Sequence, residues 1–185
     1  MINDKRIVIS GSFSVGKTTL LHDLPFIHKI DSTERELIRL LNIDFNQLNQ
    51  DQLENFQIQL AEKQHTEETQ RNTFATDVGL LMCVAYTKHL PCGKKIRQLA
   101  DRYFTAHGMY DNIFHIPIEL PIEMDGVRTK DETRRNTIDQ RLQETYQEYG
   151  IEPIIVSWNR EERVAQVLTA CTWISNLKSL WKNSM

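Results

Sequence analysis

The chain has 185 residues, which is the length of one domain. Hydrophobic residues make up 40% and charged residues 25% of it, as in an ordinary globular protein, and 7 glycines and 5 prolines are too few for a linker-like or collagen-like chain. The 22 basic residues are balanced by 25 acidic ones, so no overall positive charge draws the molecule to nucleic acid or to a membrane surface.

The cysteines bear on the cellular compartment. Cys83, Cys92 and Cys171 lie far apart, in no metal-binding spacing, which is typical of reduced thiols. Residues 1–6 do not resemble a secretion signal, and the uncharged stretch Val164–Leu177 is too short and too polar to span a bilayer. We therefore expect a cytoplasmic protein that forms one domain over residues 1–185 and has no membrane partner.

Short apolar runs bounded by polar residues, glycine or proline predict five buried strands. In chain order these are residues 5–10, 26–30, 73–77, 112–117 and 154–157. Apolar residues at helical spacing predict helices between and after them. In chain order, the helices end at Pro25, begin at Ser32, cover 47–72, run to Tyr86, cover 94–106, end near Gly150 and begin near Asn159. Strands that alternate with helices predict an α/β fold with a parallel sheet.

The predicted helix over residues 47–72 is rich in glutamine, glutamate and asparagine. Its apolar stripe consists of Leu53, Phe56 and Leu60, so at most one of its faces packs on the core. The other face is wet or covers a pocket. The pattern fits a cover for a substrate pocket and a simple surface helix equally well.

A phosphate-binding loop follows the first predicted strand. Residues 11–18 fit the pattern GxxxxGK[ST] at every constrained position, and the loop stands between a strand and a helix, as this motif requires. Backbone N–H groups of such a loop converge on a polyphosphate at the positive end of a helix. Lys17 would contact the β- and γ-phosphates of ATP, and the Thr18 hydroxyl would bind Mg²⁺. The predicted nucleotide-binding residues are Gly11, Ser12, Phe13, Ser14, Val15, Gly16, Lys17, Thr18 and Thr19.

The kind of P-loop protein depends on the acid that ends the third predicted strand. The chain lacks the DxxG and NKxD sequences of GTPases, and Asp77 is followed by Val78 rather than by the second acid usual in mechanical ATPases. A single strand-end acid is typical of small-molecule kinases, in which it orients or deprotonates the acceptor hydroxyl and helps to hold Mg²⁺. A helix-capping or solvated Asp77 is the alternative.

A charged segment over residues 123–136 predicts a lid. It lies between the fourth and fifth strands, where P-loop kinases carry a mobile segment whose arginines close over the transferred phosphoryl group. Arg128, Arg134 and Arg135 suit this task. A solvated start of a charged helix explains the segment equally well.

Taken together, the motifs resemble those of a known family. It is the P-loop ATPase/kinase family related to the nicotinamide ribonucleoside kinase domain of the bacterial NAD-biosynthesis regulator, whose members are also described as AAA-type ATP-binding domains. The similarity covers most of the chain, and the loop over residues 11–18 is its most specific part. The other matching stretches are Thr33–Glu36, Asp77–Gly79, Tyr110–Phe114, Asp125–Arg128 and Asn159–Arg163.

The resemblance implies a kinase-type P-loop NTPase fold and phosphoryl transfer from ATP to a nucleoside or nucleotide-like hydroxyl. It makes Asp77 the acceptor-side carboxylate and places Arg128, with Arg134 or Arg135, in the lid. Two positions depart from the family: Val78 stands where an arginine is frequent, and Ser32 stands where an acidic residue is usual. By the resemblance, both positions would face the acceptor. The substrate-binding residues expected by resemblance are Asp31 or Glu34, in place of the missing acid, and Arg35.

The sequence therefore predicts an ATP- and Mg²⁺-dependent kinase of a small nucleoside, nucleotide or related hydroxyl compound. A first alternative is a 5′-hydroxyl kinase of nucleic-acid ends, which would use the basic run of Lys94, Lys95, Arg97 and Arg102. A second is a nucleotide-binding regulatory module whose acceptor site has decayed. The sequence gives no indication of oligomeric state. Trp158 is expected to be a packing residue rather than a platform for a base.

Overall fold

A computed structural model describes residues 5–25, 28–30, 33–44, 47–119 and 131–182, with side chains described as far as residue 171. The strands within these ranges are β1 (Arg6–Ser10), β2 (Lys29–Ile30), β3 (Phe74–Thr76), β4 (Asn112–His115) and β5 (Ile154–Ile155). The helices are α1 (Lys17–Asp23), α2 (Thr33–Leu41), α3 (Gln50–Thr69), α4 (Leu80–Thr87), α5 (Gly93–His107), α6 (Glu132–Glu148) and α7 (Arg160–Lys182).

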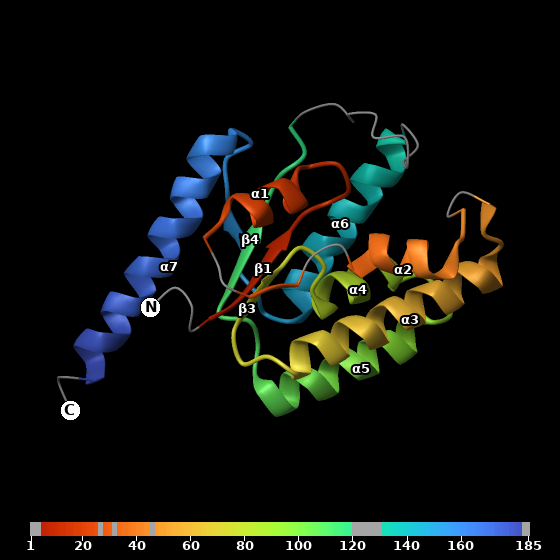
Figure 1. Cartoon of the computed structure of the whole chain (residues 1–185), viewed down its shortest axis with the longest axis horizontal. Coiled ribbons are helices and arrows are strands. Elements are labelled where there is room, and N and C mark those ends of the chain that lie inside the picture. Colours follow the sequence, from red (N-terminus) through yellow and green to blue (C-terminus); the bar gives the residue numbers. More distant parts are fainter. Residues whose placement is uncertain (1–4, 26–27, 31–32, 45–46, 120–130, 183–185) are drawn as a thin grey trace.

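The strands form one parallel sheet in the order β2-β3-β1-β4-β5 (Figure 1). β1 is the central strand: Ile7 lies opposite Ala75 of β3, and Val8 lies opposite Ile113 of β4. The predicted α/β fold with five parallel strands is confirmed. Since the carboxyl ends of parallel strands share one edge, the residues that follow β1 and β3 meet at the same edge of the sheet.

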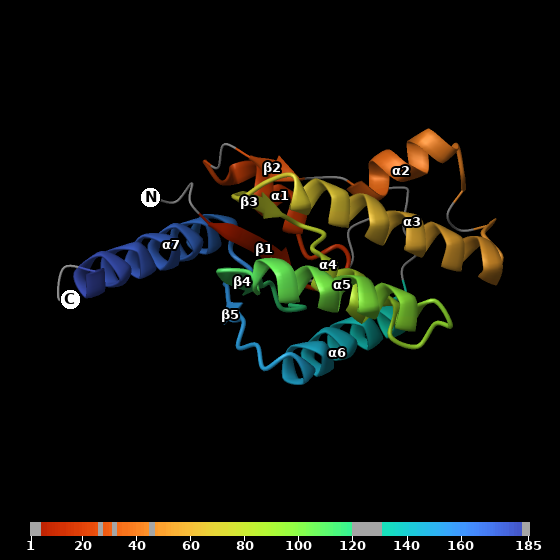
Figure 2. The same ribbon diagram turned by 90° about the horizontal axis from the view of Figure 1, so that it is seen from below.

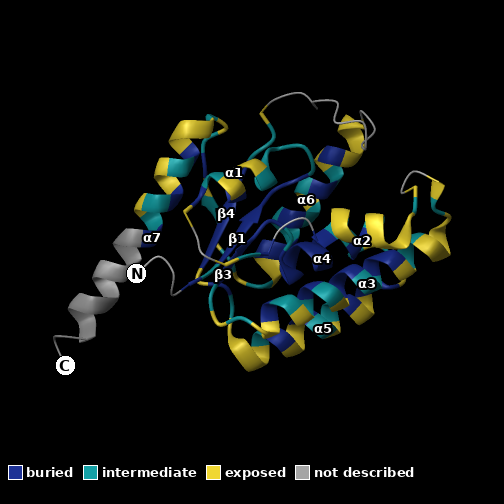
Figure 3. Cartoon of the chain, in the orientation of Figure 1, coloured by how far each residue is buried: buried dark blue, intermediate teal, exposed yellow. Residues whose placement is uncertain are grey.

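Helices cover both faces of the sheet (Figure 2). Because side chains alternate along a strand, Ile7 and Ile9 of β1 point to one face and Val8 points to the other. Ile7 and Ile9 pack with α1 and α7, whereas Val8 packs with α3, α4, α5 and α6. Figure 3 shows the sheet as a buried layer between helices whose outer faces are exposed.

The predicted ends of the elements differ from the observed ends in two informative places. The polar helix was expected over residues 47–72, but α3 begins after Asn49 because Asn49 and Gln52 form a capping box. The last strand was expected over 154–157, but β5 has two residues, as befits an edge strand with a single neighbour. The second predicted strand includes residues 26 and 27, which lie outside the described residues.

Three further expectations can be compared with the structure. In the part of the chain that the structure describes, no helix is both long and apolar enough to span a membrane. Cys83, Cys92 and Cys171 are buried and form no disulfide. Trp158 is 50% exposed, so its expected role as a packing residue is wrong. It follows the short strand β5, where few elements remain to cover it.

Candidate functional site

The loop between β1 and α1 has the backbone shape that the motif predicts. Gly11, Ser14 and Gly16 all have positive φ angles, 136°, 57° and 86°. Glycine is needed at position 11, because a Cβ there would lie 2.7 Å from the Ile116 carbonyl oxygen. Gly16 is the N-cap of α1, so the loop ends at the amino terminus of that helix. The partial positive charge of a helix amino terminus favours an anion at this place.

Three cationic side chains contact carbonyl groups of this loop. The Lys17 ammonium donates to the Ser12 oxygen at 2.6 Å, Arg135 of α6 donates to the Ser14 oxygen at 3.3 Å, and Arg163 of α7 donates to the Val15 oxygen at 3.3 Å. Arg135 and Arg163 are 1% and 6% exposed. Burial lowers the pKa of the Arg163 guanidinium. Charges gathered at a helix amino terminus and shielded from water attract a polyanion strongly.

Asp77 lies beside the loop, directly after β3. The Thr18 hydroxyl donates a hydrogen bond to its Oδ2 atom. The carboxylate is 3% exposed, and within the described residues its Oδ1 atom has no hydrogen-bond partner. A buried carboxylate oxygen without a partner is costly, unless a ligand completes the site. Together with the Thr18 hydroxyl it offers the oxygen donors that Mg²⁺ prefers.

The two lid arginines described by the structure are placed differently. The Arg135 backbone oxygen accepts a hydrogen bond from the Ser12 hydroxyl at 2.8 Å, in addition to the side-chain contact with Ser14. Arg134 is exposed, and its backbone N–H bonds the Asp131 side chain at 2.8 Å as part of the α6 cap. Arg128 and the rest of the predicted lid before residue 131 lie outside the described residues. α6 therefore presents Arg135 to the loop.

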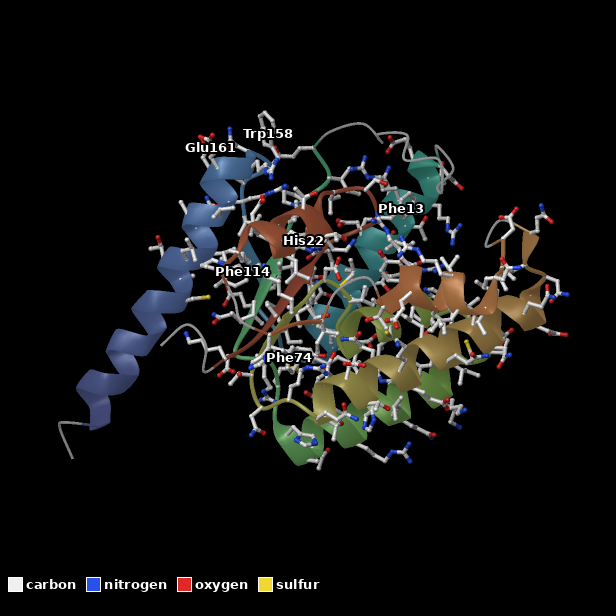
Figure 4. All side chains as sticks on the ribbon, viewed as in Figure 1. Phe13, His22, Phe74, Phe114, Trp158 and Glu161 are labelled. Atoms are coloured by element: carbon white, nitrogen blue, oxygen red, sulfur yellow. The ribbon has the colours of Figure 1, made fainter. Side chains whose placement is uncertain are left out.

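The other predicted loop residues are divided between contact with the core and exposure. Phe13 packs toward the core cluster that includes α6, and Val15 packs toward the cluster of α1 and α7. Figure 4 labels Phe13 close to α6, with His22 further along α1. Thr19 is exposed in the first turn of α1.

The predicted acceptor-side residues gather at the start of α2. Glu34 is half-buried and Arg35 is exposed, both in the first turn of this helix, while Asp31 lies outside the described residues. Thr33, the first residue of α2, and Thr76, the last of β3, both hydrogen-bond the side chain of Gln64 on α3, at 3.0 and 3.2 Å. The start of α2 is therefore linked to the strand end that carries Asp77.

The basic run proposed for nucleic-acid ends lies along α5. Lys95 pairs with Glu62 at 3.0 Å, and Arg97 pairs with Glu148 and stacks over the Tyr149 ring at 5.2 Å. Two of the four cations are thus engaged by side chains of α3 and α6. Among the described residues, no group of three or more histidine, cysteine, aspartate and glutamate side chains is arranged to hold a metal ion.

Sequence reasoning assigned no role to three buried residues near the site: Arg163, Gln64 and Glu68. A signal was present for each. Arg163 belongs to the Asn159–Arg163 stretch that matched the family. Gln64 and Glu68 continue the apolar stripe of Phe56 and Leu60 at intervals of four residues, so they lie on the buried face of α3.

The phosphate-binding loop after the central strand β1 and the parallel sheet together define a P-loop domain of the kinase type. The AAA domain family matches residues 6–163, and the chain belongs to that family. A comparison with curated proteins finds no match.

Solved structures share the fold. NadR in complex with NR is 24% identical, with a TM-score of 0.63 over 84% of this chain and 46% of that one. NadR with NAD and AMP-PNP is 21% identical, with a TM-score of 0.65 over 92% and 50%. This chain therefore spans about half of the length of NadR.

Kinases of similar size to this chain also share its fold. Deoxyadenosine kinase from M. mycoides is 13% identical, with a TM-score of 0.60 over 91% of this chain and 99% of that one. Thymidylate kinase from Ehrlichia chaffeensis is 15% identical, with a TM-score of 0.56 over 89% and 98%. The predicted P-loop kinase-type fold and the predicted family relation are confirmed.

Proposed function

We propose that the protein is an ATP- and Mg²⁺-dependent phosphotransferase that acts on a hydroxyl of a nucleoside, a nucleotide or a related small molecule. The observation that carries this proposal is the contact between Thr18 and the buried Asp77, which joins the P-loop to the acid at the end of β3. A phosphate-binding loop and a carboxylate for the acceptor are the two halves that such a reaction needs. The fold shared with NadR and with nucleoside and nucleotide kinases supports the same proposal.

In this proposal, basic side chains neutralise phosphate charge and an acidic side chain removes the acceptor proton. Lys17 and Arg135 neutralise the charge of the transferred phosphoryl group, and Arg128 of the lid joins them. Asp77 orients the acceptor hydroxyl and takes its proton. The acceptor oxygen then bonds to the γ-phosphorus of ATP, the bond to the β-phosphate oxygen breaks, and ADP leaves. Glu34 and Arg35, with Asp31, bind the acceptor.

Thr18 and Asp77 would hold Mg²⁺ in this site. Their hydroxyl and carboxylate oxygens fit a hard cation, and the unpartnered Oδ1 atom of Asp77 marks a place for it among the described residues. When bound, the ion neutralises charge on the phosphates.

A small acceptor is favoured over a nucleic-acid end. The basic run on α5, which a kinase of nucleic-acid ends would need, is partly neutralised by Glu62 and Glu148. A 5′-hydroxyl oligonucleotide acceptor would also show strong salt dependence, because phosphate contacts release counterions. Neither the acceptor nor a cytoplasmic location is tested by the fold, and both stay predictions.

A transfer screen tests the proposal. γ-Labelled ATP and Mg²⁺ are incubated with nucleosides, mononucleotides, nicotinamide riboside and 5′-hydroxyl oligonucleotides, and labelled products are separated. We expect one small hydroxyl compound to accept the label well above the rate of ATP hydrolysis. ATP binding without transfer to any acceptor would instead support a regulatory module.

In the same assay, the variant Asp77→Asn tests whether Asp77 takes the proton of the acceptor hydroxyl. The variant keeps nucleotide binding, because the loop is intact, but its kcat falls by about 10²-fold or more, since the proton acceptor is lost. Asp51→Asn, at an exposed position in the first turn of α3, is the matched control and keeps full activity. Unchanged turnover in Asp77→Asn would remove Asp77 from the mechanism.

A further inference from the structure

Two polar side chains occupy the buried face of α3, where apolar residues would be expected. Gln64 is 0% exposed and Glu68 is 1% exposed. Burying a polar or ionisable side chain is unfavourable unless hydrogen bonds replace those it made with water. Such residues persist in a core only where their hydrogen bonds compensate, so their partners indicate what they hold in place.

Gln64 bridges two elements of the acceptor side. Its Oε1 atom accepts a hydrogen bond from the Thr33 hydroxyl at 3.0 Å, and its Nε2 group donates to the Thr76 hydroxyl at 3.2 Å. The same Nε2 group donates to Oε1 of Glu68 at 2.8 Å. One amide thus fixes the first residue of α2 to the last residue of β3 and joins both to Glu68.

Glu68 holds the other end of the turn that carries Asp77. Its Oε1 atom accepts from the Leu80 backbone N–H at 3.1 Å, and its Oε2 atom accepts from the Tyr110 hydroxyl at 2.8 Å. The Tyr110 oxygen in turn accepts from the Leu80 N–H at 2.9 Å. Gly79 allows this approach, because a Cβ there would stand 3.1 Å from the Tyr110 hydroxyl. A carboxylate at the first residue of α4 also benefits from the helix dipole.

Two residues one turn apart on α3, Gln64 and Glu68, therefore hold both ends of the turn between β3 and α4. Thr76, before Asp77, is bound by Gln64, and Leu80, after it, is bound by Glu68. The Val78 N–H adds a bond to the Thr76 hydroxyl at 3.2 Å. Within three residues of these anchors lies the only acid that contacts Thr18 among the described residues.

We infer that Gln64 and Glu68 act as a clamp, defined as this hydrogen-bonded pair, that positions Asp77 and the start of α2 for the acceptor half of the site. The inference rests on the proposed phosphotransferase function. Both are positioning residues, since they act through Thr76, Leu80 and Thr33. The clamp is strongest with Glu68 as a carboxylate: three groups donate hydrogen bonds to it, and protonation removes the negative charge that strengthens these bonds.

The surroundings of Glu68 make this charge sensitive to pH. Burial raises the pKa of Glu68 to about 7, although the hydrogen bonds from Gln64, Tyr110 and Leu80 act in the opposite direction. The titratable groups that interact with it are Cys83 of α4, Tyr103 of α5 and Tyr110, while Arg6 of β1 acts on Tyr103 and Glu34 of α2 acts on Cys83. The hydrogen bonds that Glu68 accepts in the clamp should therefore weaken as the pH falls through about 7.

The experiment measures how much Mg²⁺ strengthens the binding of AMP-PNP, by calorimetry with and without the ion. This ratio depends on the placement of Asp77 against Thr18 and is insensitive to a general loss of stability. At pH 8 we expect the ratio to fall about tenfold in Gln64→Met and in Glu68→Gln, the loss of roughly one charged hydrogen bond, with Mg²⁺-free binding unchanged. Glu62→Gln, on the exposed face of α3, is the matched control and keeps the wild-type ratio.

A pH series on the wild type requires no variant. After correction for the binding of Mg²⁺ by free AMP-PNP at each pH, the wild-type ratio should drop between pH 8 and pH 6, and Glu68→Gln should show no drop. An equal ratio in folded wild type, Gln64→Met and Glu68→Gln, or a pH-independent wild-type ratio, would overturn the clamp. This experiment uses no acceptor, so it is independent of the transfer screen. If the screen fails while the Mg²⁺ ratios are as expected, the phosphotransferase function is discarded and the clamp is kept.

Discussion

Arg135 is a buried cation whose two polar ends both meet the P-loop: its carbonyl binds Ser12 and its guanidinium binds Ser14. A planar guanidinium that is already in place stabilises phosphoryl charge better than a mobile ammonium. We therefore expect Arg135→Lys to lower kcat by about 10²-fold, with less effect on the KM for ATP. Steady-state kinetics with the accepted substrate measure this.

Arg134→Lys is the control for that substitution, since Arg134 is the neighbouring arginine in the first turn of α6 and is exposed. It should keep wild-type kcat. If Arg134→Lys costs as much as Arg135→Lys, the loop contact of Arg135 does not decide which arginine serves the reaction.

Glu68 also links stability to pH. Because burial raises the pKa of this carboxyl from 4.5 to about 7, the native state holds a proton that the unfolded chain has released between these values. The native state therefore loses stability as the pH rises from about 4.5 to about 7, by roughly 3 kcal/mol from this group. Glu68→Gln cannot ionise and should lack that loss.

Urea unfolding of both proteins at pH 4.5 and pH 8 measures the effect. The free energy of unfolding of Glu68→Gln should gain on that of the wild type as the pH rises, with Glu67→Gln as a neighbouring control. A difference between wild type and Glu68→Gln that does not change with pH would show that Glu68 ionises normally.

A residue of the candidate site could be proposed from sequence when its geometry depends on its neighbours along the chain. The loop over residues 11–18 could be read from sequence because its backbone shape depends on two glycines and its chemistry on adjacent residues. Asp77 could be singled out as a candidate because it ends a predicted strand. Gln64 and Glu68 were not assigned a role: their spacing from Phe56 and Leu60 places them on the buried face of a glutamine-rich helix, but only the partners Thr76 and Tyr110 show what they bind there.

At the scale of elements, α7 supports the P-loop from outside the sheet. Arg163 in its first turn donates to the Val15 oxygen, and its guanidinium lies where a Cβ on Gly16 would come within 2.9 Å. Nearby, Arg160 pairs with Asp23 at the end of α1, at 2.7 and 2.8 Å, but is 66% exposed. Arg163 is thus a buried link from α7 to the P-loop, and Arg160 is an exposed link from α7 to α1.

Arg163→Met should reduce the free energy of unfolding by about 1–3 kcal/mol and weaken AMP-PNP binding, because the Val15 carbonyl loses a charged donor in a buried place. Arg160→Met should lower the free energy of unfolding less than Arg163→Met does, because an exposed ion pair contributes little. Urea unfolding and calorimetry provide both quantities. Equal effects of the two substitutions would mean that α7 holds α1 rather than the loop.

The ends of the elements were less predictable than the elements themselves. Apolar patterning located each strand, but the pairing partner decides where a strand stops, and β5 has a partner on one side only. The start of α3 depends on one capping pair, Asn49 and Gln52, within a run of similar polar residues. Such boundaries depend on single hydrogen bonds rather than on periodicity.

At the scale of the whole molecule, the sheet order places the chemistry at one edge. Alternating strands and helices predicted a parallel sheet, but not the order β2-β3-β1-β4-β5, because each apolar strand could pair with several others. This order sets β1 beside β3, so the P-loop and Asp77 become neighbours although 59 residues separate Thr18 from Asp77. α6 and α7 then contribute Arg135 and Arg163 to the same loop from opposite faces of the sheet.

Because the nucleotide would join β1, β3, α6 and α7 at one place, its binding should stabilise the whole fold. At a ligand concentration of about 100 times Kd, the gain is about 2.7 kcal/mol, which for a chain of this size raises Tm by roughly 5–10 °C. Calorimetric scans with Mg²⁺ and AMP-PNP measure this shift. Lys17→Met should abolish it while leaving the Tm of the free protein near that of the wild type, since the Lys17 ammonium is only partly buried. A shift retained in Lys17→Met would mean that the nucleotide binds away from the P-loop.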